Sequence, residues 1–226
     1  SFGDYFKEEA IEFSWQLLTS EFSLPKDNLL ITTHKDDEES SQIWKKISGL
    51  SSDKIISIET EDNFWSMGTE GPCGPCSELY YDFNPEKGLK NIDLEDGDRF
   101  IEFYNLVFMQ YEKFKENGEI KRRELPAPSV DTGAGLERLI ACLQGKYWNY
   151  DTDVFAPIIK KIEAISGKKY DDEKYTTAMR VLCDHIRSSV FLITDGVIPS
   201  NEGRGYVLRR IIRRAIRFLD QLEVTN

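Results

Sequence analysis

The sequence predicts an α+β fold with antiparallel strands, followed by a helical portion. Runs of β-branched and aromatic residues, which are typical of strands, occur before about residue 145. Two of these runs, residues 99–114 and 118–125, are separated by a short polar turn, which favours antiparallel pairing. Beyond residue 145 the apolar residues recur at helical spacing. We therefore expect an α+β domain over residues 1–150 and a helical domain over residues 151–226.

The first element is a predicted helix over residues 4–22. Its apolar residues recur at spacings of three and four and form a wide stripe, so we expect the helix to be well buried. Asp4 stands where it can cap the first turn. The stripe comprises Phe6, Ala10, Ile11, Phe13, Trp15, Leu17 and Leu18.

A β-α-β tract follows the first helix. Residues 28–34 and 54–60 are rich in β-branched residues and read as strands. Between them, residues 36–49 start with acidic side chains and end in Gly49, as a helix does. Residues 63–78 are interrupted by glycines and prolines, and we expect a loop there.

Two further predicted strands are joined by an acidic connection. Residues 79–83 are a predicted strand, and residues 84–98 are expected to form an exposed acidic loop or hairpin. The aromatic strand 99–114 follows, with 118–125 as its antiparallel return. Both sides of strand 99–114 are largely apolar, which predicts burial of both faces.

Two polar residues interrupt that aromatic strand. Strict alternation places Glu102 and Asn105 on opposite sides, and each needs a partner if it is buried. Either they satisfy neighbouring backbone groups, or the strand forms the floor of a substrate pocket. In the pocket interpretation Asn105 orients the substrate and Val107 is a small apolar wall.

A glycine-containing junction, "PAPSVDTGAGLERL" at residues 126–139, joins a short predicted strand to a helix. Asp131 either caps that helix or holds a cation such as an ammonium group, because a carboxylate repels phosphate. Gly133 and Gly135 let a ligand approach the main chain, and a helix N-terminus favours phosphate. Arg138, one turn further on, can pair with a polyphosphate. This combination suits the activation of an amino acid by ATP.

Four helices are expected in the remainder of the chain. The first covers residues 135–145, and the second follows turns within residues 147–167. The third covers residues 175–196 and the fourth residues 206–222. Residues Ala178, Leu182, Ile186 and Val190 recur at a spacing of four along the third helix.

Charge is distributed unevenly along the chain. The net charge is −11, but residues 181–217 hold seven arginines against three acidic residues, which gives +4 there and −15 elsewhere. A basic amphipathic helix of this kind binds RNA, a membrane surface or an acidic partner. Asn201 and Arg204 are placed to reach base edges or sugar, and the later arginines suit phosphates. These arginines are Arg209, Arg210, Arg213, Arg214 and Arg217.

The four cysteines are too few for a disulfide scaffold and indicate reduced thiols in the cytosol. Cys73 and Cys76 form a C-x-x-C motif, but neither His34 nor His185 is paired with a further ligand. We therefore expect a rigid loop at this motif rather than a zinc or redox site, with Trp65 nearby as a pocket wall. No apolar run reaches the roughly 18 residues that a membrane span needs.

Five segments together resemble the alanyl-tRNA synthetases, in order over nearly the whole chain. The resemblance implies a class II synthetase fold, an antiparallel sheet flanked by helices and followed by a helical tRNA-recognition portion. It also implies a ligase of cytoplasmic protein biosynthesis, which joins alanine to ATP as alanyl-adenylate and then to tRNA(Ala). The segments are "SFGDYFK", "NFWSMGTEGPCGPCSELYYD", "EFYNLVFMQY", "PSVDTGAGLERL" and "PSNEGRGYVLRRIIRRAIR".

The resemblance assigns roles to individual residues. Asp131 would bind the α-ammonium of alanine, with Trp65, Asn105, Val107 and Gly133 around the substrate. ATP would be bound by Arg138, Gly135 and Glu102, with Mg²⁺ implied by ATP chemistry and no metal ligand assigned. The tRNA would contact Asn201, near the acceptor-stem G·U pair, together with Arg204, Arg209, Arg210, Arg213, Arg214 and Arg217.

The resemblance also implies what this sequence lacks. The first signature motif of class II synthetases and nearly all of the second are absent, including the arginine that holds the ATP α-phosphate. The C-terminal editing domain, with its zinc ligands, and the oligomerisation domain are absent too. We therefore expect a fragment with an exposed sheet edge and impaired activity by itself. A non-catalytic RNA-binding module using helix 204–217, or an alanine sensor without chemistry, is the alternative.

Overall fold

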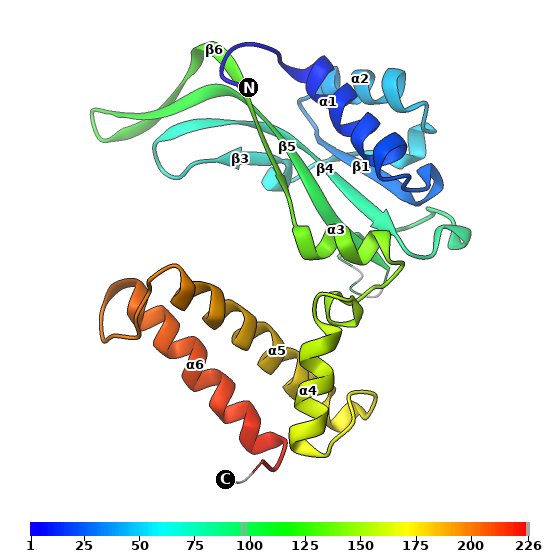
Figure 1. The fold of residues 1–226 in the computed structure, drawn as a ribbon. Coiled ribbons are helices and arrows are strands. Elements are labelled where there is room, and N and C mark those ends of the chain that lie inside the picture. The colour runs from blue at the N-terminus through cyan, green and yellow to red at the C-terminus, as the bar shows by residue number, and fades with distance from the viewer. Residues whose placement is uncertain (96, 98, 225–226) are drawn as a thin grey trace. The chain divides into compact units, whose positions relative to one another are not determined.

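Figure 1 shows the computed structural model of the chain, in which residues 1–95, 97 and 99–224 are described. The chain divides into two compact units, the first from Ser1 to Tyr147 and the second from Trp148 onward. The first unit contains the sheet and the second is helical, so the expected α+β class is confirmed.

A mixed six-stranded sheet forms the centre of the first unit. The strand order is β2-β1-β4-β5-β6, and β3 pairs with β4 outside this path. Only β1 and β2 run parallel, as the β-α-β tract predicts, and the other pairs are antiparallel. The strands are β1 (Leu29–His34), β2 (Ile55–Ile58), β3 (Phe64–Ser66), β4 (Gly71–Asp82), β5 (Phe100–Glu116) and β6 (Glu119–Ala134).

The first helix differs in detail from its prediction. The α-helix α1 covers Lys7–Gln16 and continues as a π-helical turn over Leu17–Glu21. Asp4 does not cap it, because Phe6 is the N-cap residue and no side chain caps the turn. Phe13 is 54% exposed, so the buried stripe is narrower than expected. A surface helix buries only the face that meets the sheet.

The second helix, α2 (Glu38–Ser48), agrees with its prediction at both ends. The Asp37 carboxylate accepts a hydrogen bond from the Ser40 amide, and Gly49 ends the helix with φ 68°. The Lys7 ammonium contacts Asp37 at 2.7 Å and thereby joins α1 to the capped end of α2.

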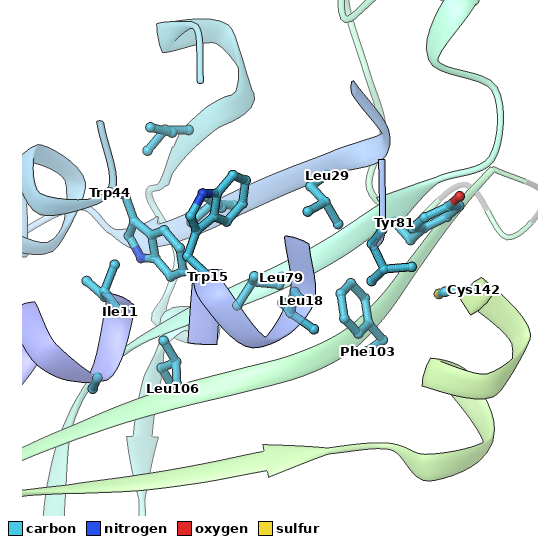
Figure 2. Close-up of a cluster of buried hydrophobic side chains, with 14 of the residues drawn as sticks. Ile11, Trp15, Leu18, Leu29, Trp44, Leu79, Tyr81, Phe103, Leu106 and Cys142 are labelled. Atoms are coloured by element: carbon cyan, nitrogen blue, oxygen red, sulfur yellow. The ribbon is translucent and has the colours of Figure 1, made fainter. Parts of the chain in front are cut away.

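One face of the sheet carries the hydrophobic core. Figure 2 shows Trp15 and Trp44 close together, with rings that meet edge to face, in one cluster with Leu29, Leu79 and Phe103. The helix α3 (Leu136–Leu143) contributes Cys142 to the same cluster. Burial of these large side chains is the main stabilising term for this unit.

The segment 63–78 is the clearest error of sequence reasoning. It contains β3 and residues 71–78 of β4 rather than a loop. A Cβ on Gly74 would lie 1.9 Å from the Phe108 carbonyl oxygen, so this glycine permits close approach of β4 to β5. The pairing of β4 with β5 shifts register between Cys73 and Cys76, which accommodates the irregular run.

Two further segments are organised differently from their predictions. Residues 118–125 and the short strand at the glycine junction form one continuous strand, β6. The connection 84–98 begins with a 3-10 turn at Pro85–Lys87 and otherwise contains turns and no strand in its described part, with residues 96 and 98 outside the description. Other 3-10 turns are Lys26–Asn28, Ser52–Lys54, Glu61–Asn63 and Asn149–Asp151.

Strand β6 lies at the end of the strand order. Among the described residues, only the first two pair with its outer side. Ser1 exchanges backbone hydrogen bonds of 2.8 and 2.9 Å with Val130, and Phe2 bridges to Ser129. In the described part of the chain, no strand pairs with the remainder of this side, so β6 is an exposed edge.

The second unit is a cluster of helices, α4 (Ala156–Ser166), α5 (Glu173–Thr194) and α6 (Gly203–Gln221). Met179 and Leu182 of α5 are buried in its core, whereas Val190, at the same helical spacing, is 57% exposed. Within the described ranges, no helix has the length and apolar character that crossing a membrane demands.

Candidate amino-acid and nucleotide site on the open sheet face

Residues far apart in the sequence are aligned in rows across the sheet. Ile31, Leu79, Leu106 and Val130 belong to the core, and successive side chains of a strand point to opposite faces. Their immediate neighbours therefore point to the opposite side, which we call the open face. One row consists of Thr32, Glu78, Asn105 and Gly133, and the adjacent row of Cys76, Val107 and Asp131.

A register shift changes the predicted side of one candidate. Leu79 opposes Tyr104 whereas Tyr80 opposes Glu102, so β5 has one extra residue at Phe103. Strict alternation would have separated Glu102 from Asn105, and that prediction is wrong. The bulge brings both residues onto the open face.

Asp131 lies within β6, directly opposite Val107. The helix α3 begins at Leu136 with Gly135 as its N-cap and without a capping side chain, so the capping interpretation of Asp131 is wrong. The Asp131 side chain is exposed on the open face. A carboxylate there is free to pair with a cationic group.

The two glycines of the junction have different surroundings. A Cβ on Gly133 would have no heavy atom within 4 Å, and its backbone does not adopt the left-handed conformation. Neither packing nor backbone geometry therefore explains this glycine, which leaves open space beside Asn105. A Cβ on Gly135 would lie 3.3 Å from the Arg138 side chain, so Gly135 makes room for that arginine.

The guanidinium of Arg138 is held by β5. Its Nη1 donates to the Glu102 carbonyl oxygen at 2.8 Å and lies 3.7 Å from Glu102 Oε2. The Arg138 side chain remains 52% exposed, so its other donors are available to an anion such as phosphate.

The two rows and the neighbouring strand β3 supply three further candidate residues: Asn105, Val107 and Trp65. Trp65 is half-buried in β3 opposite Gly74, and its backbone contacts the Cys76 thiol. Val107 is 5% exposed. The buried Asn105 Oδ1 has no hydrogen-bond partner within the described part of the protein. An unpaired buried acceptor is costly, and a ligand donor would satisfy it.

A polar network beside the first row was missed by sequence reasoning. Asn63 donates to Thr32 Oγ1 at 2.8 Å, and both Thr32 and Tyr80 donate to Glu78 Oε2, at 3.4 and 3.1 Å. Burial, and then the charge of Glu102, raises the pKa of Glu78. Local sequence had no signal for this network, because its members come from three separate segments.

This network borders an acidic cavity. The cavity measures about 660 Å³ and is adjacent to Asn63, Glu78 and Glu102. Burial, and then the charge of Glu78, also raises the pKa of Tyr80. In the described ranges, no group of three or more His, Cys, Asp and Glu side chains is arranged to hold a metal ion.

The basic helix α6 presents its predicted arginines to the surface of the second unit. Leu208 and Phe218 pack inward, whereas Val207 is 53% exposed. Arg209 donates a hydrogen bond to the Asn201 side chain. A groove of about 470 Å³ includes His185 and the arginines Arg210, Arg213, Arg214 and Arg217, and Arg204 is exposed near the start of the helix.

Comparison with known proteins identifies the family of the chain. The family described as "tRNA synthetases class II (A)" matches residues 1–226. The alanine–tRNA ligases of Prochlorococcus marinus (strain MIT 9312) and Prochlorococcus marinus (strain MIT 9301) are each 53% identical to the chain over its full length. The chain spans 25% of the length of each of these relatives. The resemblance to alanyl-tRNA synthetases is confirmed, and the chain belongs to the class II (A) family of tRNA synthetases.

Proposed function

We propose that this chain carries the alanine- and ATP-binding part of an alanine–tRNA ligase. The activity would be ATP-dependent activation of alanine and its attachment to tRNA(Ala) in the cytoplasm. The observation that carries the proposal is the pair of rows on the open face. They bring together Asn105, Val107, Asp131 and Gly133, which the sequence scatters over two segments.

Alanine would lie over β5 and β6. Its ammonium group would pair with the Asp131 carboxylate, and its methyl group would contact Val107. Gly133 leaves room for the main-chain part of the amino acid, since a Cβ there would meet nothing. The unpaired Asn105 Oδ1 would accept a hydrogen bond from the substrate. Trp65 would close one side.

ATP would lie towards Arg138 and Glu102. The Arg138 guanidinium is oriented by the Glu102 carbonyl and keeps free donors for the phosphates. Gly135 provides the space in which Arg138 sits. When bound, ATP with Mg²⁺ would supply the activated phosphate. Mg²⁺ needs only one or two carboxylates besides phosphates and water, and Glu102 stands on the right face for such a contact.

The tRNA would contact the second unit through the surface of α6. Its exposed arginines suit a phosphate backbone, and Asn201, held by Arg209, suits a base edge. Arg213→Ala should weaken binding of all acceptor stems similarly and reduce the salt slope by about one. Asn201→Ala should instead weaken discrimination among stems. Equal losses in both variants would contradict this division of roles.

Alanine-dependent exchange of pyrophosphate into ATP by the full-length gene product tests the catalytic proposal. Exchange with alanine, and its absence with leucine as control amino acid, is the expected result. An RNA-binding module without chemistry is the alternative, favoured by the arginine groove of α6. It would show a steep fall of RNA affinity with salt and no exchange.

A further inference from the structure

The C-x-x-C motif has two cysteines with different surroundings. Both are buried free thiols in β4. Cys73 lies opposite Ser66 of β3 and Tyr111 of β5. Cys76, beyond the register shift, lies opposite Val107 instead. The motif therefore places one thiol within the candidate amino-acid site and the other outside it.

Cys76 lies among three residues of the proposed amino-acid site, because it pairs with Val107 and its thiol hydrogen-bonds to the Asn105 side chain and the Trp65 backbone. Its row continues through Val107 to Asp131. Burial raises the pKa of the Cys76 thiol to about 12, although the Asn105 side chain and the Trp65 backbone oppose this rise by hydrogen bonding to it. Cys76 is thus a neutral thiol, and a neutral thiol behaves as a small apolar group with weak hydrogen-bonding capacity.

In the proposed binding mode, the Cys76 side chain would fill the space below the amino acid. Cys76 is 2% exposed and Val107 is 5% exposed, so the floor between them is closed. A smaller residue at position 76 would leave a hollow under the amino-acid side chain. A larger residue would push the floor upwards, because protein interiors are close-packed.

We propose that Cys76 determines amino-acid specificity by closing the floor of the alanine subsite, so that a methyl group is accepted and a longer aliphatic side chain is not. The inference rests on the proposed function. It names a residue of the pocket that acts through volume and low polarity rather than through charge. The substrates that this subsite would accept are α-amino acids whose side chain has one carbon.

The test compares amino acids in pyrophosphate exchange by the full-length gene product. The ratio of kcat/KM for 2-aminobutyrate to that for alanine should rise about tenfold or more in Cys76→Ala, because one methylene is worth about 10–200-fold in an apolar pocket. Cys76→Val should shift preference the other way, raising the glycine-to-alanine ratio. Cys73→Ala is the matched control, and both ratios should stay within about twofold of the original protein.

Unchanged ratios in Cys76→Ala and Cys76→Val, with both proteins folded by circular dichroism, would overturn the inference. Equal shifts in the Cys73 control would overturn it too. Should Cys76→Ala fail to fold, Cys76→Ser keeps the volume and adds a stronger hydrogen-bonding group. Its serine-to-alanine ratio should then rise, and an unchanged ratio refutes the role of low polarity. Absence of alanine-dependent exchange in the original protein would instead refute the proposed function.

Discussion

The two faces of the sheet in the first unit use the same strands for different purposes. On the covered face, Leu79 and Leu106 pack beneath Trp15 of α1 and are fully buried. On the open face, their neighbours Glu78 and Asn105 are polar, and Asn105 retains an unpaired buried acceptor. Residues of the covered face stabilise the fold, whereas the open face keeps an unpaired buried polar atom, as the proposed site would require. Substitutions on the two faces should therefore differ in their effects on stability and on binding.

The largest effect on stability is expected on the covered face. Phe108 is fully buried and meets the Phe6 ring at 5.7 Å. Phe108→Ala should lower the free energy of unfolding by about 3–5 kcal/mol, because it removes apolar contacts and leaves a cavity. Urea denaturation followed by circular dichroism measures this. A loss below about 1 kcal/mol would show that this face is not the stabilising one.

The largest effect on binding is expected on the open face. Asp131→Asn should weaken alanine binding by about 2–5 kcal/mol, since the substrate ammonium would lose its charged partner. Its unfolding free energy should change by less than about 0.5 kcal/mol, because the side chain is exposed. Titration calorimetry and urea denaturation give the two values. Asp4→Asn, another exposed carboxylate, is the control, and intact alanine binding in Asp131→Asn would refute its role.

Two glycine substitutions should give smaller effects, one on stability and the other on binding. Gly74→Ala should destabilise the protein by about 1–3 kcal/mol or more, because the new Cβ would meet the Phe108 carbonyl oxygen. Gly133→Ala should leave stability within about 0.5 kcal/mol, because its Cβ meets nothing, but should weaken alanine binding. Thermal unfolding and calorimetry of both variants test the pair. Equal stability of the two would contradict the close approach of β4 to β5.

The smallest effect concerns the pH dependence of stability. Burial and Glu102 raise the pKa of Glu78 in the folded state, so the folded protein binds this proton more tightly than the unfolded chain does. The free energy of unfolding should therefore fall as the pH rises from the pKa of Glu78 in the unfolded chain to its higher pKa in the folded protein. Glu78→Gln removes this dependence and should be more stable than the original protein at pH 7, with the difference vanishing below about pH 4. Urea denaturation at the two pH values measures the difference in stability. A Glu78→Gln variant that is less stable than the original protein at pH 7 would contradict the prediction.

Local patterns predicted those features that depend on neighbouring residues in the chain. The caps Asp37 and Gly49 place α2 correctly because capping involves residues within one turn. The same reasoning failed for Asp131, which also precedes a helix but lies in β6. An N-cap and a strand residue both have extended backbone, and only pairing with Val107 distinguishes them.

Composition misled the prediction at residues 63–78, where glycine and proline normally interrupt strands. The partner strand decided otherwise, because Gly74 allows the Phe108 carbonyl to approach. The bulge at Phe103 likewise follows from pairing with β4 and is invisible in the alternation of β5 alone. It brings Glu102 to the open face beside Arg138.

By itself, the sequence determined the class of fold and the helical periodicities. It also determined that the carboxylate of Asp131 stands near a residue without a side chain, Gly133. Only the tertiary structure decided which side chains share a face, that Cys76 opposes Val107, and that Asn63, Thr32 and Glu78 form one network. Strand register explains the difference. It is set by hydrogen bonds between segments distant in the chain, and one extra residue reverses the side on which every following residue lies.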